Sequence, residues 1–304
     1  MIVNKRINIS LILFLGMLAV STSPVAAKIL NQSTEVEGIM IAFWRMAFAS
    51  IILWLFSFFR KQGSFKNYIN LNSSILSGIF LGFHFALFFV ALDLTKIANA
   101  TFLGTLTPVF TLILEITFLK RKFSYGVYIG LVCALLGAFI IFLGAPLDLE
   151  NNDMQGNFFA VLCSFVLAIS FLISEKVRQT ESTIVYTRTL YTSATITLFI
   201  VALIFEKNIF PNHNHYFIYS GFIYLGLVPT IVGHNAFYYS LRYIKPTIIA
   251  AVPLAEPIIA SIIGWFLFPI LSMNDQLILN NWEYTIIGGI ISLIGIFFVI
   301  KNRN

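Results

Sequence analysis

Apolar residues fill the chain in long runs that are separated by short polar connections. A membrane-spanning helix needs about 20 mostly apolar residues, because the hydrocarbon core is about 30 Å thick and each helical residue rises about 1.5 Å. The runs of this length are residues 9–29, 39–59, 74–94, 98–119, 125–145, 156–176, 184–205, 217–240, 247–268 and 284–300. The pattern predicts an all-α polytopic membrane protein with ten transmembrane helices and no separate soluble domain.

Composition agrees with this prediction. Of 304 residues, 59% are hydrophobic and 11% are charged, whereas a soluble domain has about 45–50% apolar and about 25% charged residues. The net charge of +6 is too scattered to predict a nucleic-acid partner; the expected surroundings are a lipid bilayer. Cys133 and Cys163 lie inside apolar runs, so no disulfide framework is expected.

The N-terminal segment allows two interpretations. Lys5 and Arg6, the apolar run after them and the small residues at 25–27 imitate a secretory signal peptide. However, the run has about 20 apolar residues, whereas a signal peptide has about 7–15. We therefore expect a true first helix.

Basic residues indicate the orientation, because Lys and Arg near helix ends are retained in the cytoplasm. With the N-terminus inside, 14 of the 19 Lys and Arg residues fall on the cytoplasmic side. Both termini are therefore expected in the cytoplasm of a bacterial cell, with the protein in the inner membrane.

The chain also contains an internal repeat. The segment from Ala91-Leu92 to Thr107-Pro108 recurs 149 residues later, from Ser240-Leu241 to Glu256-Pro257, and Arg45 recurs as Arg188. The repeat divides the chain into residues 1–150 and 151–304, each with five spans. Because five is odd, the second half enters the membrane inverted, which is a recurrent plan of secondary transporters. Shared apolar composition by itself also produces some self-similarity.

Taken in order, these motifs resemble the EamA-type transporters of the drug/metabolite transporter superfamily. The motifs are a helix that ends in Lys28, an Arg in the second helix, Thr107-Pro108 and its recurrence as Glu256-Pro257. The resemblance implies a ten-helix exporter or facilitator of small metabolites, often amino acids, with a central cavity. Relatives often carry a Glu shortly after helices four and nine. Here those places read Leu119-Lys120-Arg121 and Phe268-Pro269-Ile270, so that Glu has no counterpart.

Intramembrane charges are candidate functional groups because each costs about 2.5–3.5 kcal/mol to insert. Glu256 lies deepest, between Pro253 and Pro257, which free backbone carbonyls. It either binds a substrate ammonium or exchanges a proton, or it is tied to a neighbouring helix. Arg45 and Arg188 lie at mirrored depths and either reach the headgroups or bond carbonyls at a gate.

Three further groups of polar residues and prolines complete the expected site. Glu115 lies near the cytoplasmic end of the fourth span, where Lys120 and Arg121 can neutralise it, and it is expected at the surface in a snorkelling or ion-paired role. His84 and His234 occupy nearly equivalent repeat positions and either relay protons or bond a neighbouring helix. The expected substrate-binding residues are His84, Asn99, Thr105, Thr107, His234, Asn235, Tyr238 and Glu256, and the expected gating or structural residues are Pro24, Arg45, Pro108, Arg188, Pro253 and Pro257.

The function predicted on these grounds is secondary transport, with export of a small metabolite such as an amino acid by alternating access, and with proton coupling through these groups. No cofactor and no metal are expected, because no ligand spacing or nucleotide-binding loop is present. The alternative is an integral-membrane enzyme that acts on a lipid-soluble substrate with His84, His234 and Glu256 as acid–base groups.

Overall fold

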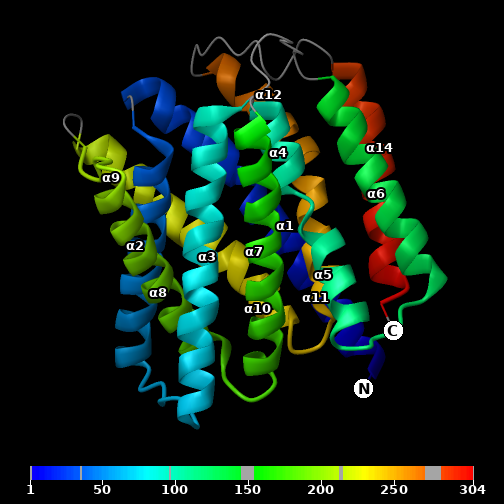
Figure 1. Ribbon diagram of the computed structural model, residues 1–304, viewed down its shortest axis with the longest axis horizontal. Coiled ribbons are helices and arrows are strands. Elements are labelled where there is room, and N and C mark those ends of the chain that lie inside the picture. Colours follow the sequence, from blue (N-terminus) through cyan, green and yellow to red (C-terminus); the bar gives the residue numbers. More distant parts are fainter. Residues whose placement is uncertain are drawn as a thin grey trace.

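Helices run side by side through the molecule in one bundle (Figure 1). The computed structural model describes residues 2–34, 36–95, 97–144, 154–211, 215–270 and 282–303. Its first half contains α1 (Ile2–Thr34), α2 (Gly38–Phe59), α3 (Tyr68–Leu94), α4 (Ile97–Gly104), α5 (Thr107–Thr117) and α6 (Tyr125–Leu143). Its second half contains α7 (Met154–Arg178), α8 (Thr183–Ile204), α9 (His215–Leu225), a π-helical segment (Gly226–His234), α10 (Asn235–Ser240), α11 (Pro246–Ala251), a 3-10 turn (Val252–Ala255), α12 (Glu256–Ile270) and α14 (Trp282–Lys301).

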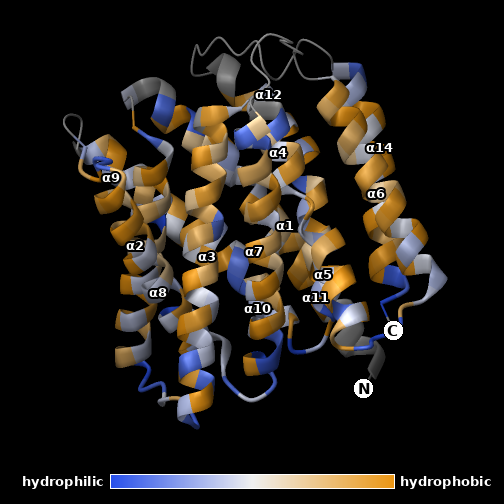
Figure 2. Cartoon of the chain, viewed as in Figure 1, coloured by the Kyte–Doolittle hydropathy of each residue, from blue (hydrophilic) through white to orange (hydrophobic). Residues whose placement is uncertain are grey.

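The described part of the chain holds ten helical spans that are long and apolar enough to cross a membrane, and it contains no strand. They coincide with the ten expected runs, so the all-α, ten-span prediction is confirmed. The outer faces of the helices are largely hydrophobic (Figure 2). For example, Ile129 and Leu136 on α6 and Ile290 and Phe297 on α14 are exposed, as expected for side chains that face lipid tails.

Both termini lie at the same end of the bundle, where α1 begins and α14 ends (Figure 1). We call this end the termini side and the opposite end the far side. The first apolar run is part of the bundle as α1, which packs against α12 and the π-helical segment. Its Leu13 is completely buried, and Met17 and Val20 belong to the same core.

Two spans are interrupted at equivalent positions of the repeat. The fourth span consists of α4 and α5, and the ninth consists of α11, the 3-10 turn and α12. The second piece of each span begins at Thr107 and at Glu256, which are 149 residues apart, as are the starts of α4 and α11 at Ile97 and Pro246. The shift found in the sequence is therefore reproduced by the backbone, and the fold consists of two inverted five-helix repeats.

Glycines determine how α6 and α14, the last helices of the two repeats, cross. Gly130 lies against the Gly295 backbone, and Gly137 lies against the backbone around Gly288. A Cβ added at Gly130 would come within 2.7 Å of the Gly295 carbonyl oxygen, so a larger residue would push the helices apart. Small residues allow such close approach where no hydrophobic effect drives helices together. Each glycine pair is the image of the other, as a two-fold relation between the repeats requires.

Candidate functional site

Arg45 is the buried charge around which the centre of the bundle is organised. It projects from α2, and its side chain is only 7% exposed. Its Nε donates to the Thr230 hydroxyl at 2.7 Å and its Nη1 donates to the Ser23 hydroxyl at 2.9 Å. The guanidinium carbon lies 5.3 Å from the centroid of the Phe85 ring. The remaining Nη2 is buried and has no hydrogen-bond partner within the described part of the chain, so this nitrogen has a bond left to offer an anionic group.

The π-helical segment positions the hydroxyl that receives Arg45. Pro229 lies inside this segment and supplies no backbone N–H. The Thr230 hydroxyl donates back to the Leu225 carbonyl five residues earlier, at 2.8 Å, and accepts from Arg45. Single π turns in α-helices are frequent at functional sites. The apolar sequence of this span predicted a helix but not its widened turn.

Glu256 faces the same centre from the other repeat. It follows the 3-10 turn that contains Pro253 and begins α12, with Pro257 directly after it. As a residue it is half-buried, and it interacts electrostatically with Arg45. Arg45 belongs to the first repeat, so ionisable groups of opposite type from the two halves lie within electrostatic reach of one another.

The two histidines also lie near Arg45, and both interact electrostatically with it. His84 of α3 is half-buried, and its Nδ1 lies 3.0 Å from the Cys163 carbonyl oxygen. His234, the last π-helical residue, is half-buried beside the Phe237 ring. His84 and His234 also interact with each other. The structure therefore brings both predicted histidines to one place.

Tyrosines and an amide form another wall of this centre. The Tyr191 hydroxyl donates to the Asn235 side-chain oxygen at 2.8 Å. The Tyr238 ring lies 6.3 Å from the Tyr191 ring. Asn235 and Tyr238 were expected here from the sequence. Tyr191 was expected only as one of many aromatic residues, because nothing local distinguishes it.

The other predicted residues lie outside these contacts. The Thr105 hydroxyl donates to the Phe102 carbonyl at 2.7 Å, within the break between α4 and α5. Asn99 donates to the Thr95 hydroxyl at 3.4 Å. Thr107 is buried, and no described residue forms a hydrogen bond with its hydroxyl. Their roles in binding remain predictions.

The predicted gating residues behave differently from one another. Pro108, Pro253 and Pro257 lie at the two helix breaks, whereas α1 continues through Pro24 without a break. Arg188 binds the end of α2 and the loop after it, because it donates to the Ser57 hydroxyl and, at 2.8 Å, to the Gly63 carbonyl. Its environment is thus unlike that of Arg45.

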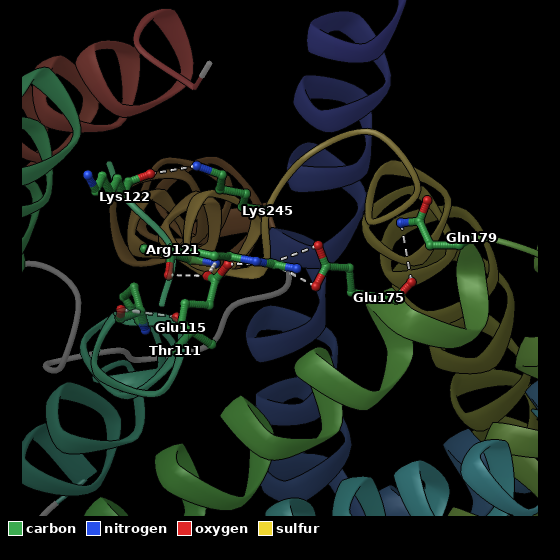
Figure 3. Close-up of polar contacts among 9 residues, drawn as sticks. Thr111, Glu115, Arg121, Lys122, Glu175, Gln179 and Lys245 are labelled. Carbon is green, nitrogen blue, oxygen red and sulfur yellow. Dashed lines mark hydrogen bonds and ion pairs between the residues drawn. The ribbon is translucent and has the colours of Figure 1, made fainter. Parts of the chain in front are cut away.

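A second polar group lies at the termini side and was only partly foreseen. We call Glu115, Arg121, Glu175 and Thr247 the ionic cluster (Figure 3). Arg121 Nη1 lies 2.6 Å from Glu115 Oε1 and 2.8 Å from Glu175 Oε2. Glu115 Oε2 accepts from the Thr247 backbone N–H at 2.8 Å and from its hydroxyl at 2.5 Å. The cluster joins α5 and its following loop to α7 and α11.

The predicted ion pair between Glu115 and Arg121 is confirmed, but its expected place at the surface is wrong. The Glu115 side chain is fully buried, because α11 begins directly over it and its first backbone groups occupy the carboxylate. Arg121 lies in the loop beyond α5. Burial works against its charge, yet the hydrogen bonds to Glu175 and Glu115 prevail and raise the pKa of Arg121. The role of Glu175 was not predicted, since it is one of many charges near helix ends.

On the far side the corresponding region contains an apolar groove of about 260 Å³. It lies between α1, α9 and α12. Its lining consists of Thr22, Val25, Ala26, Ile29, Leu30, Phe217, Ser220, Gly221, Tyr224, Ile263 and Leu267. Along α1 the groove begins at the level of Ser23, the partner of Arg45. The part of the chain that the structure describes has no group of three His, Cys, Asp or Glu residues that could hold a metal ion.

Comparison with known proteins agrees with the duplicated fold. A curated protein of Synechocystis sp., described as an uncharacterized transporter, is 29% identical over 217 residues, or 69% of this chain. The chain spans 59% of the length of that relative. A solved crystal structure has a TM-score of 0.70 at 14% identity and covers 94% of this chain and 97% of its own, which shows a shared fold.

The family comparison covers nearly the whole chain in two pieces. Residues 8–143 and 154–301 each match the EamA-like transporter family. Both matches lie within the predicted halves 1–150 and 151–304; the exact boundary falls among residues 145–153, outside the described residues. The chain therefore belongs to the EamA-like transporter family.

Proposed function

We propose that this protein is a secondary transporter that exports small metabolites such as amino acids from a bacterial cell by alternating access. The observation that carries the proposal is the pair of ionisable groups of opposite type from the two repeats, Arg45, whose Nη2 has no hydrogen-bond partner among the described residues, and the half-buried Glu256. An amino acid carries both a carboxylate and an ammonium group. Arg45 suits the first and Glu256 the second, because charge-assisted hydrogen bonds are the strongest that such groups form.

The placement of these residues supports binding between the two halves. Arg45 and His84 come from the first repeat, and Asn235, Tyr238 and Glu256 come from the second. In transporters built from inverted repeats, substrate sites lie at the repeat interface near interrupted helices. Glu256 begins the second piece of such a helix. Proton coupling in this proposal uses Glu256 and His84, which bind and release a proton as the site changes sides.

The direction of insertion rests on charge. The termini side holds most of the Lys and Arg residues, and basic residues near helix ends are retained in the cytoplasm. In the proposed orientation the termini side faces the cytoplasm of a bacterial inner membrane and the apolar groove opens outside.

Transport by proteoliposomes tests this function. Vesicles with purified protein are loaded with a panel of radiolabelled amino acids, and efflux is measured under pH and voltage gradients. Glu256→Gln removes the charge while it keeps the size, so we expect efflux to fall about tenfold or more, the loss of one charge-assisted hydrogen bond. The matched control is Glu283→Gln, in the exposed first turn of α14.

Two results would contradict the proposal. One is a wild-type protein that moves no member of the panel under either gradient. The other is a Glu256→Gln variant with the efflux rate and pH dependence of Glu283→Gln.

A further inference from the structure

The ionic cluster joins the two repeats at the termini side. Glu115 and Arg121 belong to the first repeat, and Glu175 and Thr247 belong to the second. Arg121 holds both carboxylates through one nitrogen, Nη1 (Figure 3). While these contacts persist, α5 cannot separate from α7 and α11 at the termini side.

The inverted repeat shows what occupies the equivalent places at the far side. The shift of 149 residues, which relates Thr107 to Glu256, carries Glu115 to Gly264. The shift of 148 residues, which relates Lys28 to Lys176, carries Glu175 back to Ala27. Neither counterpart carries a charge. Among the described residues, the far side therefore has the same backbone elements without carboxylates at these two positions, although Lys207 and Glu37 form an exposed ion pair elsewhere at that end.

The apolar groove lies where those carboxylates are missing. Ile263 and Leu267 of its α12 wall flank Gly264, and Ala26 of its α1 wall precedes Ala27. At the termini side, the counterpart of Ala26 is Ser174, which is fully buried. Its hydroxyl lies 2.5 Å from the Tyr186 hydroxyl and 3.1 Å from that of Ser77. The α1 position therefore borders an open groove at the far side, whereas its counterpart on α7 is packed against other side chains at the termini side.

We propose that the ionic cluster is a latch that holds the termini side closed and favours the state in which the far side is open. This rests on the proposed function, since alternating access requires the two ends to open in turn. A ligand or mutation shifts the equilibrium between the state open at the far side and the state open at the termini side only if it stabilises one state more than the other. Arg121 contributes because its bridge to Glu175 exists in the closed state of the termini side and is broken when α7 moves away.

Glu175 is the residue to change, because Glu175→Gln removes the bridge to α7 but leaves Glu115 paired with Arg121 and Thr247. The matched control is Gln179→Ala, in the turn directly after α7, where the side chain is exposed and its Nε2 donates to the Glu175 carbonyl. A second control, Lys122→Gln, removes an exposed charge next to Arg121.

Two cysteine reporters at equivalent positions measure which end is open. They are Ala26→Cys in the groove and Ser174→Cys at the termini side, each in a chain with Cys133 and Cys163 changed to Ala. Labelling uses a membrane-impermeant maleimide in proteoliposomes, with the reagent added to each side in turn. In the otherwise wild-type chain we expect rapid labelling of Ala26→Cys and almost none of Ser174→Cys.

Glu175→Gln is expected to raise Ser174→Cys labelling and to lower Ala26→Cys labelling, so that their ratio changes about three- to tenfold, as expected for a charge pair near the surface. Both controls keep the wild-type ratio. The latch is overturned if Glu175→Gln, eluting as monodisperse protein, labels like Gln179→Ala, or if Ala26→Cys is protected in the wild-type background. Because labelling needs no substrate, a protein that transports nothing but shows the shift would contradict only the proposed function.

Discussion

The two ends of this bundle share a backbone plan but differ in what lies between the helices. At the termini side, Arg121 joins Glu115 of α5 to Glu175 of α7. At the far side, the equivalent helices border an apolar groove of about 260 Å³. The contrast shows that an inverted repeat does not by itself make the two ends equal in energy. Glu115 and Glu175 at one end, whose counterparts at the other end are Gly264 and Ala27, break the symmetry.

The centre of the bundle and the ionic cluster also differ in their suitability for a ligand. The centre, with Arg45 and Glu256, draws one charge from each repeat and is suited to a ligand. The ionic cluster is not suited to a ligand in the same way, because protein groups already form hydrogen bonds with its carboxylates. Charges that are satisfied internally hold helices in place, whereas an unpartnered donor such as Arg45 Nη2 leaves a bond to be made.

The largest expected effect comes from removing the cation of the ionic cluster. Arg121→Gln leaves the buried Glu115 with Thr247 as its only bonded side chain. We expect unfolding in detergent to become easier by about 3 kcal/mol, the low end of the cost of breaking a buried pair, because Arg121 is partly exposed. Denaturant titration followed by circular dichroism measures this. Lys122→Gln serves as the control, and equal midpoints for the two variants would show that the cluster contributes no stability.

A smaller effect is expected from filling the groove. Ala26→Phe places a ring between α1 and α12, so the far side no longer opens fully. Efflux of a transported substrate is expected to fall about tenfold, which corresponds to about 1.4 kcal/mol. Leu18→Phe, on the exposed face of the same helix, is the matched control. Unchanged efflux by Ala26→Phe would exclude the groove from the path.

The smallest effect tests the geometry of the cluster rather than its charge. Arg121→Lys keeps a cation, but an ammonium is a compact point charge and lacks the planar fork that matches carboxylates. We expect the ratio of Ser174→Cys to Ala26→Cys labelling to rise about threefold, between wild type and Arg121→Gln. A labelling ratio equal to that of Arg121→Gln would mean that the latch requires the geometry of the guanidinium group. A wild-type ratio would mean that a positive charge alone is sufficient.

Much of the fold followed from simple rules applied to the sequence. Run length identified the ten spans, since lipid imposes one length on every crossing helix. Pro253 and Pro257 indicated the interruption of the ninth span, because proline removes a donor and disturbs the preceding turn. The break in the fourth span was not predicted. For Pro24 the same rule failed, as α1 accommodates this residue without a break.

The site was less accessible to such rules. Arg45, the histidines and Glu256 were found because an intramembrane ionisable group is rare and costly, so each one stands out. Tyr191 and Glu175 did not stand out, since one is an aromatic residue among many and the other lies where charges are common. What distinguishes them is a partner 44 residues away for Tyr191 and 54 residues away for Glu175.

The sequence by itself determined the number of spans, their duplication and the placement of ionisable groups in apolar helices, because these depend on residue type and order along one chain. Only the tertiary structure decided which charges are satisfied. Glu115 is enclosed by Arg121 and by the start of α11, while Arg45 keeps one nitrogen unpartnered. Partners of this kind come from helices far apart in the chain, and their distances are fixed only when the helices pack.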